Sequence, residues 1–545
     1  MLSINKRCTR TVLVLLCAVL TARGTAAVNV LGFAVPGARS HQFAVLRVGQ
    51  ELAKRGHNFT LLVSSEEALD KQRLGKRAFD GLHMATFQGP EGIGTQDWFV
   101  NQPRDVAEAM RAFQSDQMAM AEHLHADVAT IQHLRDTGFD IYLKDCWYWP
   151  ADVLEDMLSV VSVDVCPFST GMPVLEQRLS IPNKVAYMPQ LGTAYHSSMT
   201  FLQRIRNYLQ AWLVRVLVMR VSDDHTRRFC IKTGQRIRSF DQGVTSAAAV
   251  IVSADWAVEH PFPMPPKVQM VGPILAEPAQ PLPSELSSFL DQGTAQGLAA
   301  VYVCMGSAGR LTQPQLHSMA QGLSALPNPV LWKLSKIDLP GNTTKESLGV
   351  GSNIKVVDWA PQNDILGHAA VKVFVTHAGS NGLYEAAFHG KPVVSVPIMN
   401  EQPDNAAKAV YHGFGITVLP SKLDPMNGKP IHEAVTSILH NPAFLANAQQ
   451  VQKRMSNPRT PAERAADIVE QVLATNGEDY LETRQSKLYW WQLALLDVKL
   501  FLVVAVFLLL CFAGLVLYLA FKVLLNTLRW ARALAVPPNC KRKTT

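Results

Sequence analysis

A short polar stretch between an apolar run and a helical pattern carries the residues best suited to bind an anion. Residues 371–375 predict a strand, residues 377–382 predict a turn of glycines and small polar residues, and residues 383–389 predict a helix. In such a turn, backbone N–H groups and the positive end of the helix can approach a phosphate closely. His377 and Asn381 can add hydrogen-bond donors. The stretch therefore predicts a phosphate site.

Neighbouring side chains suit the rest of a nucleotide. Glu385 follows Asn381 by one helical turn, where a carboxylate can accept hydrogen bonds from ribose hydroxyls. Trp359 offers a flat face for a base, and Gln362 can form hydrogen bonds beside it. Taken alone, each of these residues is more often structural, as a core Trp or a capping Asn is. Their combination favours a nucleotide site.

Residues 359–402 resemble, position by position, the signature box of the UDP-dependent glycosyltransferases. The resemblance implies that the Trp stacks on uracil, that His377 contacts the diphosphate and that Glu385 binds the ribose. It also implies that Glu401 and Gln402 contact the sugar hydroxyls. The box therefore resembles a complete site for a UDP-sugar.

Two features upstream of the box extend this site. Gly306 and Ser307 follow an apolar strand and form a second small turn that could face the diphosphate. Lys333 follows a Trp, at a position where membrane-bound animal relatives usually have Arg. The residues expected to bind the UDP-sugar are Gly306, Ser307, Lys333, Trp359, Gln362, His377, Gly379, Ser380, Asn381, Gly382, Glu385, Glu401 and Gln402.

A second set of residues predicts a catalytic base. His41 follows an apolar strand and begins a helix, and Asp145 ends another apolar strand, so both are expected at the carboxyl edge of one parallel sheet. A lone His is usually structural, but Ser40 and His41 match the position at which the family supplies its catalytic base. By resemblance, Asp145 holds and polarises His41. Asp140 is the weaker candidate, because it begins its strand rather than ending it.

Composition and charge exclude a nucleic-acid surface. The chain has 545 residues, 48% hydrophobic content and a net charge of +7. The first 27 residues contribute +4 and residues 500–545 contribute +6, which leaves −3 for residues 28–499. The basicity therefore belongs to targeting and membrane segments.

The sequence contains no DxD triplet, so we do not expect a metal that bridges the diphosphate. We expect no other cofactor, and UDP-glucose or UDP-glucuronate is the expected co-substrate.

The chain divides into targeting, catalytic and membrane segments. Its length suits two or three cores, and two α/β patterns flank a proline-rich segment. The resemblance implies the GT-B arrangement, in which two Rossmann-like domains face a cleft. The expected parts are a signal peptide (1–27), an N-terminal acceptor-binding domain (28–270), a linker (271–283), a C-terminal UDP-sugar-binding domain (284–455), a crossover helix with a membrane-proximal segment (456–499), a transmembrane helix (500–521) and a basic cytosolic tail (522–545).

Two segments predict contact with a membrane. Residues 500–521 contain no charge and span roughly 33 Å as a helix at ~1.5 Å per residue, which suffices for a bilayer core. The basic tail predicts a cytosolic C-terminus, a lumenal body and a type I protein, and residues 541–545 resemble an endoplasmic-reticulum retrieval signal. Residues 199–219 predict a helix with apolar and Arg residues, which is either a core helix with a solvated face or a helix on a membrane surface.

The resemblance implies an inverting, metal-independent transfer of a sugar from a UDP-sugar to a hydroxyl of a hydrophobic acceptor. Two alternatives stay open: a non-catalytic UDP-sugar-binding partner that pairs with related enzymes, and a dedicated sphingolipid or sterol glycosyltransferase. Homo- or hetero-oligomers with related enzymes are also compatible with the sequence. Gln402 favours glucose or glucuronate over galactose, because galactosyl-type relatives carry His there, and Lys333 in place of Arg favours glucose.

Two sequons begin at Asn58 and Asn342 and predict glycosylation sites. Four cysteines, Cys146, Cys166, Cys230 and Cys304, are scattered through residues 28–499 without metal-site spacing, and they leave the disulfide connectivity open.

Overall fold

The computed structural model describes residues 27–65, 82–94, 106–169, 176, 178–182, 184–235, 245–306, 310–341, 343–423, 427–483 and 488–535. The chain forms two units, a body that ends at Glu482 and a unit that begins at Thr483. Most of the expected signal peptide, the end of the basic tail, Ser307 and Asn342 lie outside the described residues.

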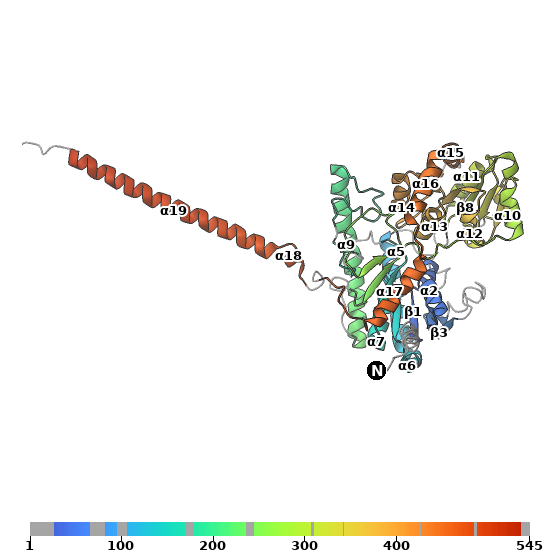
Figure 1. Cartoon of the computed structure of the whole chain (residues 1–545), viewed down its shortest axis with the longest axis horizontal. Coiled ribbons are helices and arrows are strands. Elements are labelled where there is room, and N and C mark those ends of the chain that lie inside the picture. The colour runs from blue at the N-terminus through green and yellow to red at the C-terminus, as the bar shows by residue number, and fades with distance from the viewer. Residues whose placement is uncertain are drawn as a thin grey trace, which may run out of the picture. The chain divides into compact units, whose positions relative to one another are not determined.

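The first half of the body is built on a parallel sheet of seven strands in the order β3-β2-β1-β4-β5-β6-β7 (Figure 1). Its strands are β1 (Asn29–Phe33), β2 (Asn58–Ser64), β3 (His83–Phe87), β4 (Ile141–Asp145), β5 (Ser162–Cys166), β6 (Ala249–Val252) and β7 (Val268–Met270). Buried Val, Ile and Leu are common in the central strands β1, β2, β4, β5 and β6, as expected for a sheet covered on both faces, whereas the edge strand β3 is largely exposed. The helices of this half are α2 (Arg39–Lys54), α5 (Val106–Ala126), α6 (Val128–Thr137), α7 (Trp149–Leu158) and α9 (Phe201–Thr233).

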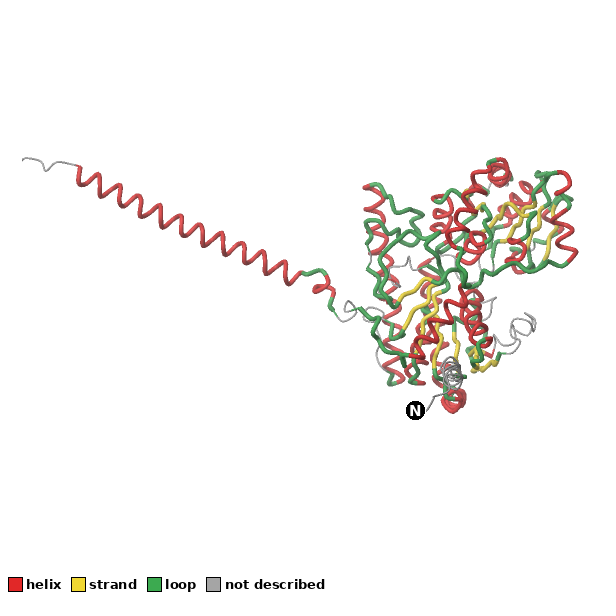
Figure 2. Tube along the Cα trace, in the orientation of Figure 1, coloured by secondary structure: helices red, strands yellow, loops and turns green. Residues whose placement is uncertain are grey.

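The second half contains a parallel sheet of six strands in the order β10-β9-β8-β11-β12-β13. Figure 2 shows the strands of the body in yellow and its helices in red. Its strands are β8 (Ala300–Cys304), β9 (Val330–Lys333), β10 (Ile354–Val357), β11 (Val371–Thr376), β12 (Val393–Ser395) and β13 (Gly415–Thr417). Its helices are α10 (Ser284–Asp291), α11 (Gln313–Ser324), α12 (Gln362–Gly367), α13 (Ser380–Phe388), α14 (Gln402–Tyr411), α15 (Lys429–His440) and α16 (Pro442–Met455). Two parallel α/β halves agree with the fold class predicted from the sequence.

The last helix of the body, α17 (Pro461–Ala474), returns to the first sheet. Its apolar face, with Ala465 and Val469 fully buried, shares a core with α2 and β1. Arg55 at the end of α2 pairs with Asp467 at 2.9 Å and with Glu470 at 2.8 Å. The last helix of the body therefore packs against the N-terminal half.

The start of α13 differs from the sequence prediction. A turn was expected as far as Gly382, but the helix begins at Ser380, after the N-cap residue Gly379. Asn and Gly have low helix propensity, and tertiary packing overrides that preference because Asn405 Nδ2 donates to Ala378 O and to Ser380 Oγ. The short turn therefore consists of residues 377–379, and residues 380–382 form the first turn of the helix.

A disulfide that the sequence left open joins Cys146, directly after β4, to Cys166 at the end of β5. Both positions lie at the carboxyl ends of neighbouring strands of the first sheet, one residue beyond Asp145 in the case of Cys146. The bridge therefore holds together the strand ends that carry the predicted catalytic pair.

The first part of α9 exposes apolar side chains. The helix extends to Thr233, beyond the predicted end, and its first 13 residues carry seven exposed hydrophobic residues with 43–74% of their surface accessible: Phe201, Leu202, Ile205, Tyr208, Leu209, Trp212 and Leu213. Asn207, on the opposite side of the helix, is fully buried. These seven exposed residues form the apolar stripe of α9. Because the body does not cover them, the alternative of a core helix with a solvated face is wrong for this part of the helix.

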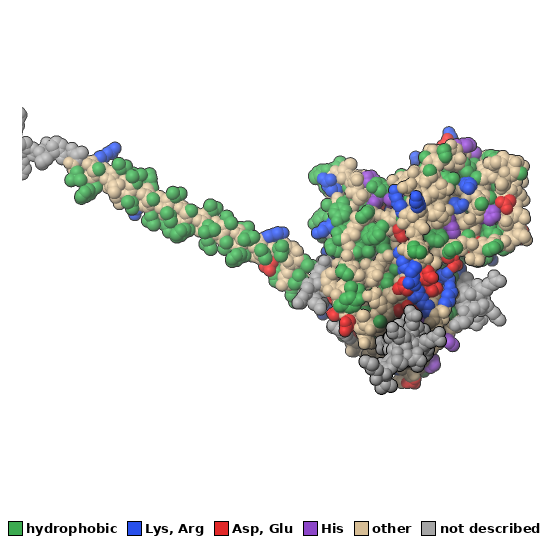
Figure 3. Space-filling view, viewed as in Figure 1, with side chains coloured by type: hydrophobic (Ala, Val, Ile, Leu, Met, Phe, Trp, Pro, Cys, Tyr) green, Lys and Arg blue, Asp and Glu red, His purple; other side chains and the backbone are tan. Residues whose placement is uncertain are grey.

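The second unit consists mainly of α19 (Leu496–Ala535), which follows the short α18 (Trp490–Leu493). Residues Leu496–Arg532 are long and apolar enough to cross a membrane. Hydrophobic side chains cover α19 along its length, with Lys and Arg near its ends (Figure 3). The helix contains the predicted span 500–521 and continues beyond it.

Candidate active site

The structure brings His41 and Asp145 into contact. His41 lies in the first turn of α2, and its Nδ1 is 2.6 Å from Oδ2 of Asp145, the last residue of β4. They meet because β1, which leads into α2, pairs in parallel with β4. The Asp145 carboxylate also accepts hydrogen bonds from Trp147 N at 2.9 Å and Val35 N at 3.4 Å. Asp140 lies at the other end of β4, where it accepts a hydrogen bond from Asn29 N.

This contact determines which ring nitrogen of His41 is available. Asp145 is almost fully buried and held by backbone donors, so its carboxylate accepts the proton of Nδ1. In the neutral imidazole, this tautomer leaves Nε2 as the nitrogen that can accept a hydrogen bond. The phenyl ring of Phe168 lies 5.4 Å from the imidazole and covers one side of it.

In the second half, His377 lies between two glycines. A Cβ atom at Gly306 or at Gly379 would overlap the imidazole ring, and Gly306 has a φ of +78°, which disfavours any other residue. The turns after β8 and β11 therefore close on the ring. Burial, together with the charge of Lys333, lowers the pKa of His377 to about 4. His377 is neutral at pH 7 and can act there as a hydrogen-bond partner but not as a cation.

The predicted base and ribose residues surround the start of α12. Trp359 exposes 72% of its surface, which leaves a face of its indole ring open. Gln362 Nε2 donates to the carboxylate of Glu385 across the gap between α12 and α13. Burial raises the pKa of Glu385 to about 7, and the hydrogen bond from Gln362 opposes that shift. In the structure, Gln362 therefore forms a hydrogen bond with Glu385, the predicted ribose residue.

Glu401 and Gln402 lie at the start of α14. The amide oxygen of Gln402 accepts hydrogen bonds from Ile398 N at 2.8 Å and Met399 N at 3.0 Å, so only its amide nitrogen is available to a ligand. Burial raises the pKa of Glu401, while the Ser380 backbone and the charge of His41 oppose that shift. Glu401 lines the same cavity as Phe168, the ring that packs against His41 in the other half.

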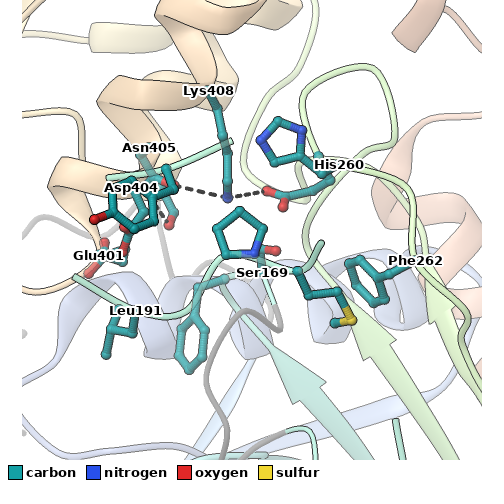
Figure 4. A pocket seen from close by; sticks show the side chains of 14 residues that line it. Ser169, Leu191, His260, Phe262, Glu401, Asp404, Asn405 and Lys408 are labelled. Carbon is teal, nitrogen blue, oxygen red and sulfur yellow. Dashed lines mark hydrogen bonds and ion pairs between the residues drawn. The ribbon is translucent and has the colours of Figure 1, made fainter. Parts of the chain in front are cut away.

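A cavity opens between the two halves beside these residues (Figure 4). It contains about 680 Å³ of empty space, part of which is open to solvent. Ser380 and Glu401 contribute to its wall from the second half, and Phe168 contributes from the first half. Phe168 also packs against His41, so the cavity that adjoins two residues of the predicted donor site lies beside the predicted catalytic base.

A family model described as UDP-glucoronosyl and UDP-glucosyl transferase matches residues 30–529. The chain belongs to this family. It is 27% identical over 485 residues to UDP-glucuronosyltransferase 2C1 of Oryctolagus cuniculus, covering 86% of this chain and 93% of the relative. It is 28% identical over 488 residues to UDP-glucuronosyltransferase 2A3 of Cavia porcellus, covering 86% and 89%. The protein is therefore a UDP-glycosyltransferase, which transfers a sugar from a UDP-sugar to an acceptor.

Solved structures of glycosyltransferases confirm the GT-B fold. The glycotransferase of kitacinnamycin is similar with a TM-score of 0.58 at 18% identity, covering 82% of this chain and 99% of that chain. The calicheamicin glycosyltransferase CalG4 is similar with a TM-score of 0.56 at 18% identity, covering 83% and 99%.

In this UDP-glycosyltransferase, Asp404 and Lys408 of α14 bind residues of the first half and form a clamp between the two halves. The sequence did not predict this clamp. Asp404, in the first turn of α14, accepts hydrogen bonds from Gly192 N at 2.6 Å and Ala194 N at 2.7 Å. Gly192 and Ala194 both have positive φ, and their N–H groups point towards one carboxylate. Lys408, one turn further along α14, pairs with buried Glu259 at 2.7 Å. These partners are some 150 to 210 positions apart in the chain, so no local pattern connects them.

We expect Asp404→Ala to lower the free energy of unfolding by about 2 kcal/mol, because it leaves backbone donors without their charged acceptor. Urea unfolding of the detergent-solubilised chain measures this change. The matched control is Asp358→Ala, which removes an exposed ion pair with Lys345 and should cost less than about 1 kcal/mol. Equal losses in the two variants would contradict the clamp.

Proposed function

We propose that the protein transfers the sugar with inversion, and that His41 is the general base. Nε2 of His41 takes the proton of the acceptor hydroxyl as the oxygen attacks the anomeric carbon, and UDP leaves from the opposite side. Asp145 fixes the ring tautomer and stabilises the imidazolium that forms. The observation that carries this proposal is the 2.6 Å contact between His41 and Asp145 beside the cavity.

We propose that the donor lies along the second half, with its diphosphate at the start of α13. The N–H groups in the first turn of α13 have no partner within the helix and favour an anion there, and His377 and the Gly306 turn adjoin them. Ser307 is part of the same proposal, although it lies outside the described residues. In this arrangement Trp359 stacks on the base, and Glu385 accepts from the ribose.

For the donor sugar, we expect glucose or glucuronate to be transferred faster than galactose, with glucose favoured. The amide nitrogen of Gln402 donates to a sugar hydroxyl, and Lys333 lacks the fork of an Arg that would bind a carboxylate. Incubation of membranes carrying the protein with each UDP-sugar and with phenolic and lipid acceptors measures the glycoside formed. Faster turnover of UDP-galactose would overturn the preference, and no glycoside with any donor would overturn the transfer itself.

We propose that the body is lumenal, in the endoplasmic reticulum, and that its acceptor is hydrophobic. The apolar helix α19 supports a single membrane span, and the apolar residues around the cavity support the acceptor class. Asn58 is exposed at the start of β2 and Asn342 lies outside the described residues; both are proposed glycan sites.

The apolar stripe of α9 is proposed to lie on the membrane surface. Its exposed hydrophobic residues point away from buried Asn207, and exposed Arg204, Arg206 and Arg215 flank the stripe. A polarity-sensitive fluorophore on Leu209→Cys in proteoliposomes should shift to the blue and be quenched by brominated lipids. The same label on Gln450→Cys, on the surface of α16, is the control and should not respond. Equal responses would contradict the proposal.

A further inference from the structure

One end of the cavity is polar, and the transfer described above does not use it. His260 lines this end together with Glu259 and Lys408 (Figure 4). His260 exposes only 7% of its surface, and its Nε2 is buried with no hydrogen-bond partner. The rings of Tyr411 and His412, centred 4.9 Å and 6.4 Å away, hold the imidazole in place.

A buried polar atom without a partner requires a physical explanation. Leaving such an atom unsatisfied is costly, and folded proteins rarely do so. Here the residue lines a cavity, so a group that enters the cavity and packs against the ring can recover the lost hydrogen bond. Burial, and then the charge of Lys408, lower the pKa of His260 to about 4. The ring is therefore neutral at pH 7, and a neutral imidazole suits a hydroxyl, which can donate or accept.

The charges around the cavity favour an uncharged ligand. Lys408 is the only cationic side chain among the described residues that line it, and Glu259 already binds its ammonium at 2.7 Å. Glu259 also accepts a hydrogen bond from Tyr384 Oη. Glu401 and Asp404 add two further carboxylates to the wall. An anionic group would therefore be repelled here without a free cation to bind.

The wall between His260 and His41 is apolar. Phe168, Met188, Leu191 and Phe262 line the cavity, and the ring of Phe168 packs against the imidazole of His41. The apolar body of a ligand can therefore pack on this wall, with one end at His260 and the other beside Phe168. Burial of that body provides affinity, and the polar groups at its ends determine its orientation.

We propose that His260 selects the acceptor: the cavity takes an uncharged apolar molecule with two hydroxyls, one reacting at His41 and the other bound by His260 Nε2. This inference depends on the proposed function, in that it assigns the acceptor to the same cavity.

The test uses two matched series of acceptors. The first is 4-(ω-hydroxyalkyl)phenols with chains of two to eight carbons, and the second is the 4-alkylphenols of equal length. We expect the wild-type kcat/KM to favour the diol over the mono-ol by about tenfold or more at one chain length, as one recovered buried hydrogen bond predicts. The corresponding ω-carboxyalkyl phenols should be the poorest acceptors.

The variant His260→Phe keeps the ring packing and removes the nitrogen, and should reduce the ratio of diol to mono-ol to about one. His260→Gln restores a hydrogen-bonding group and should recover part of the ratio. His196→Phe is the control, because His196 also stacks on Tyr411, at 5.4 Å, but is exposed and outside the cavity lining. Its ratio should equal that of the wild type.

An unchanged ratio in His260→Phe, or no diol preference at any length, would overturn the inference while leaving the transfer intact. Absence of all turnover would instead count against the proposed function with this class of acceptor. In that case calorimetric binding of diol and mono-ol in the presence of UDP still decides the role of His260. Equal affinities of the wild type for the two acceptors would overturn it.

Discussion

His41→Ala should abolish glycoside formation with hydroxyl acceptors, with a loss of about 10²–10⁴-fold in kcat. An alcohol is too weak an acid to ionise at neutral pH, so its proton must be removed as the new bond forms. The structure offers Nε2 of His41 for this step, because Nδ1 is engaged by Asp145 at 2.6 Å. Initial rates with a saturating UDP-sugar and a phenolic acceptor measure the loss.

Donor binding provides the control for this variant. His41 belongs to the first half, whereas the predicted diphosphate, ribose and base contacts belong to the second, so the affinity for UDP should stay close to that of the wild type. His133→Ala removes an exposed imidazole from α6 of the same half and should leave the rate unchanged. Near-full activity of His41→Ala would place the base elsewhere.

Asp145→Asn should also lose most of the rate, since its amide can hold the wrong tautomer of the ring. The rate loss of Asp145→Asn should be smaller than that of His41→Ala, and both variants should still bind UDP. Because the Asp145 carboxylate also accepts from two backbone N–H groups, the thermal unfolding of this variant must be compared with that of the wild type.

Local patterns were sufficient to predict the strands that end beside the candidate site residues. The apolar runs before His41, Asp145 and His377 each predicted a strand, and parallel pairing then explains why His41 and Asp145 meet at one edge. The C-terminal helix was also predicted, because a long apolar run without charge is by itself sufficient to indicate a membrane-spanning helix. These features depend on short stretches of sequence.

Features that depend on distant contacts were missed or left open. The start of α13 at Ser380 depends on Asn405, 25 residues further on, which binds the turn. The outward orientation of the apolar residues of α9 depends on which face the body covers, and periodicity alone does not determine this. The clamp between Asp404 and Gly192 joins segments 212 positions apart.

The second large effect concerns the two glycines that enclose His377. Gly379→Ala should weaken UDP-sugar binding by about tenfold or more, because the new methyl overlaps the imidazole and displaces it from the start of α13. Gly306→Ala should weaken binding at least as much, since it adds the strain of a φ of +78° to the same overlap. Titration calorimetry with UDP and with the UDP-sugar measures both changes.

A substitution at a third glycine separates the effect of backbone strain from the effect of overlap with the His377 ring. Gly297 has a φ of +72° and nothing within 4 Å of its Cβ position. Gly297→Ala should therefore lower the free energy of unfolding by about 1–2 kcal/mol without altering the affinity for UDP. Unfolding measured alongside the titrations distinguishes this cost from a loss of the donor site.

Removal of the ring then tests whether the methyl acts through His377. His377→Ala alone should weaken donor binding, because the diphosphate loses a hydrogen-bond partner. In that background Gly379→Ala has no ring to displace, so its additional effect should fall to about zero and the two changes should be strongly non-additive. If Gly379→Ala weakens binding equally with and without the imidazole, the methyl acts on the backbone at the start of α13, and the role assigned to His377 is wrong.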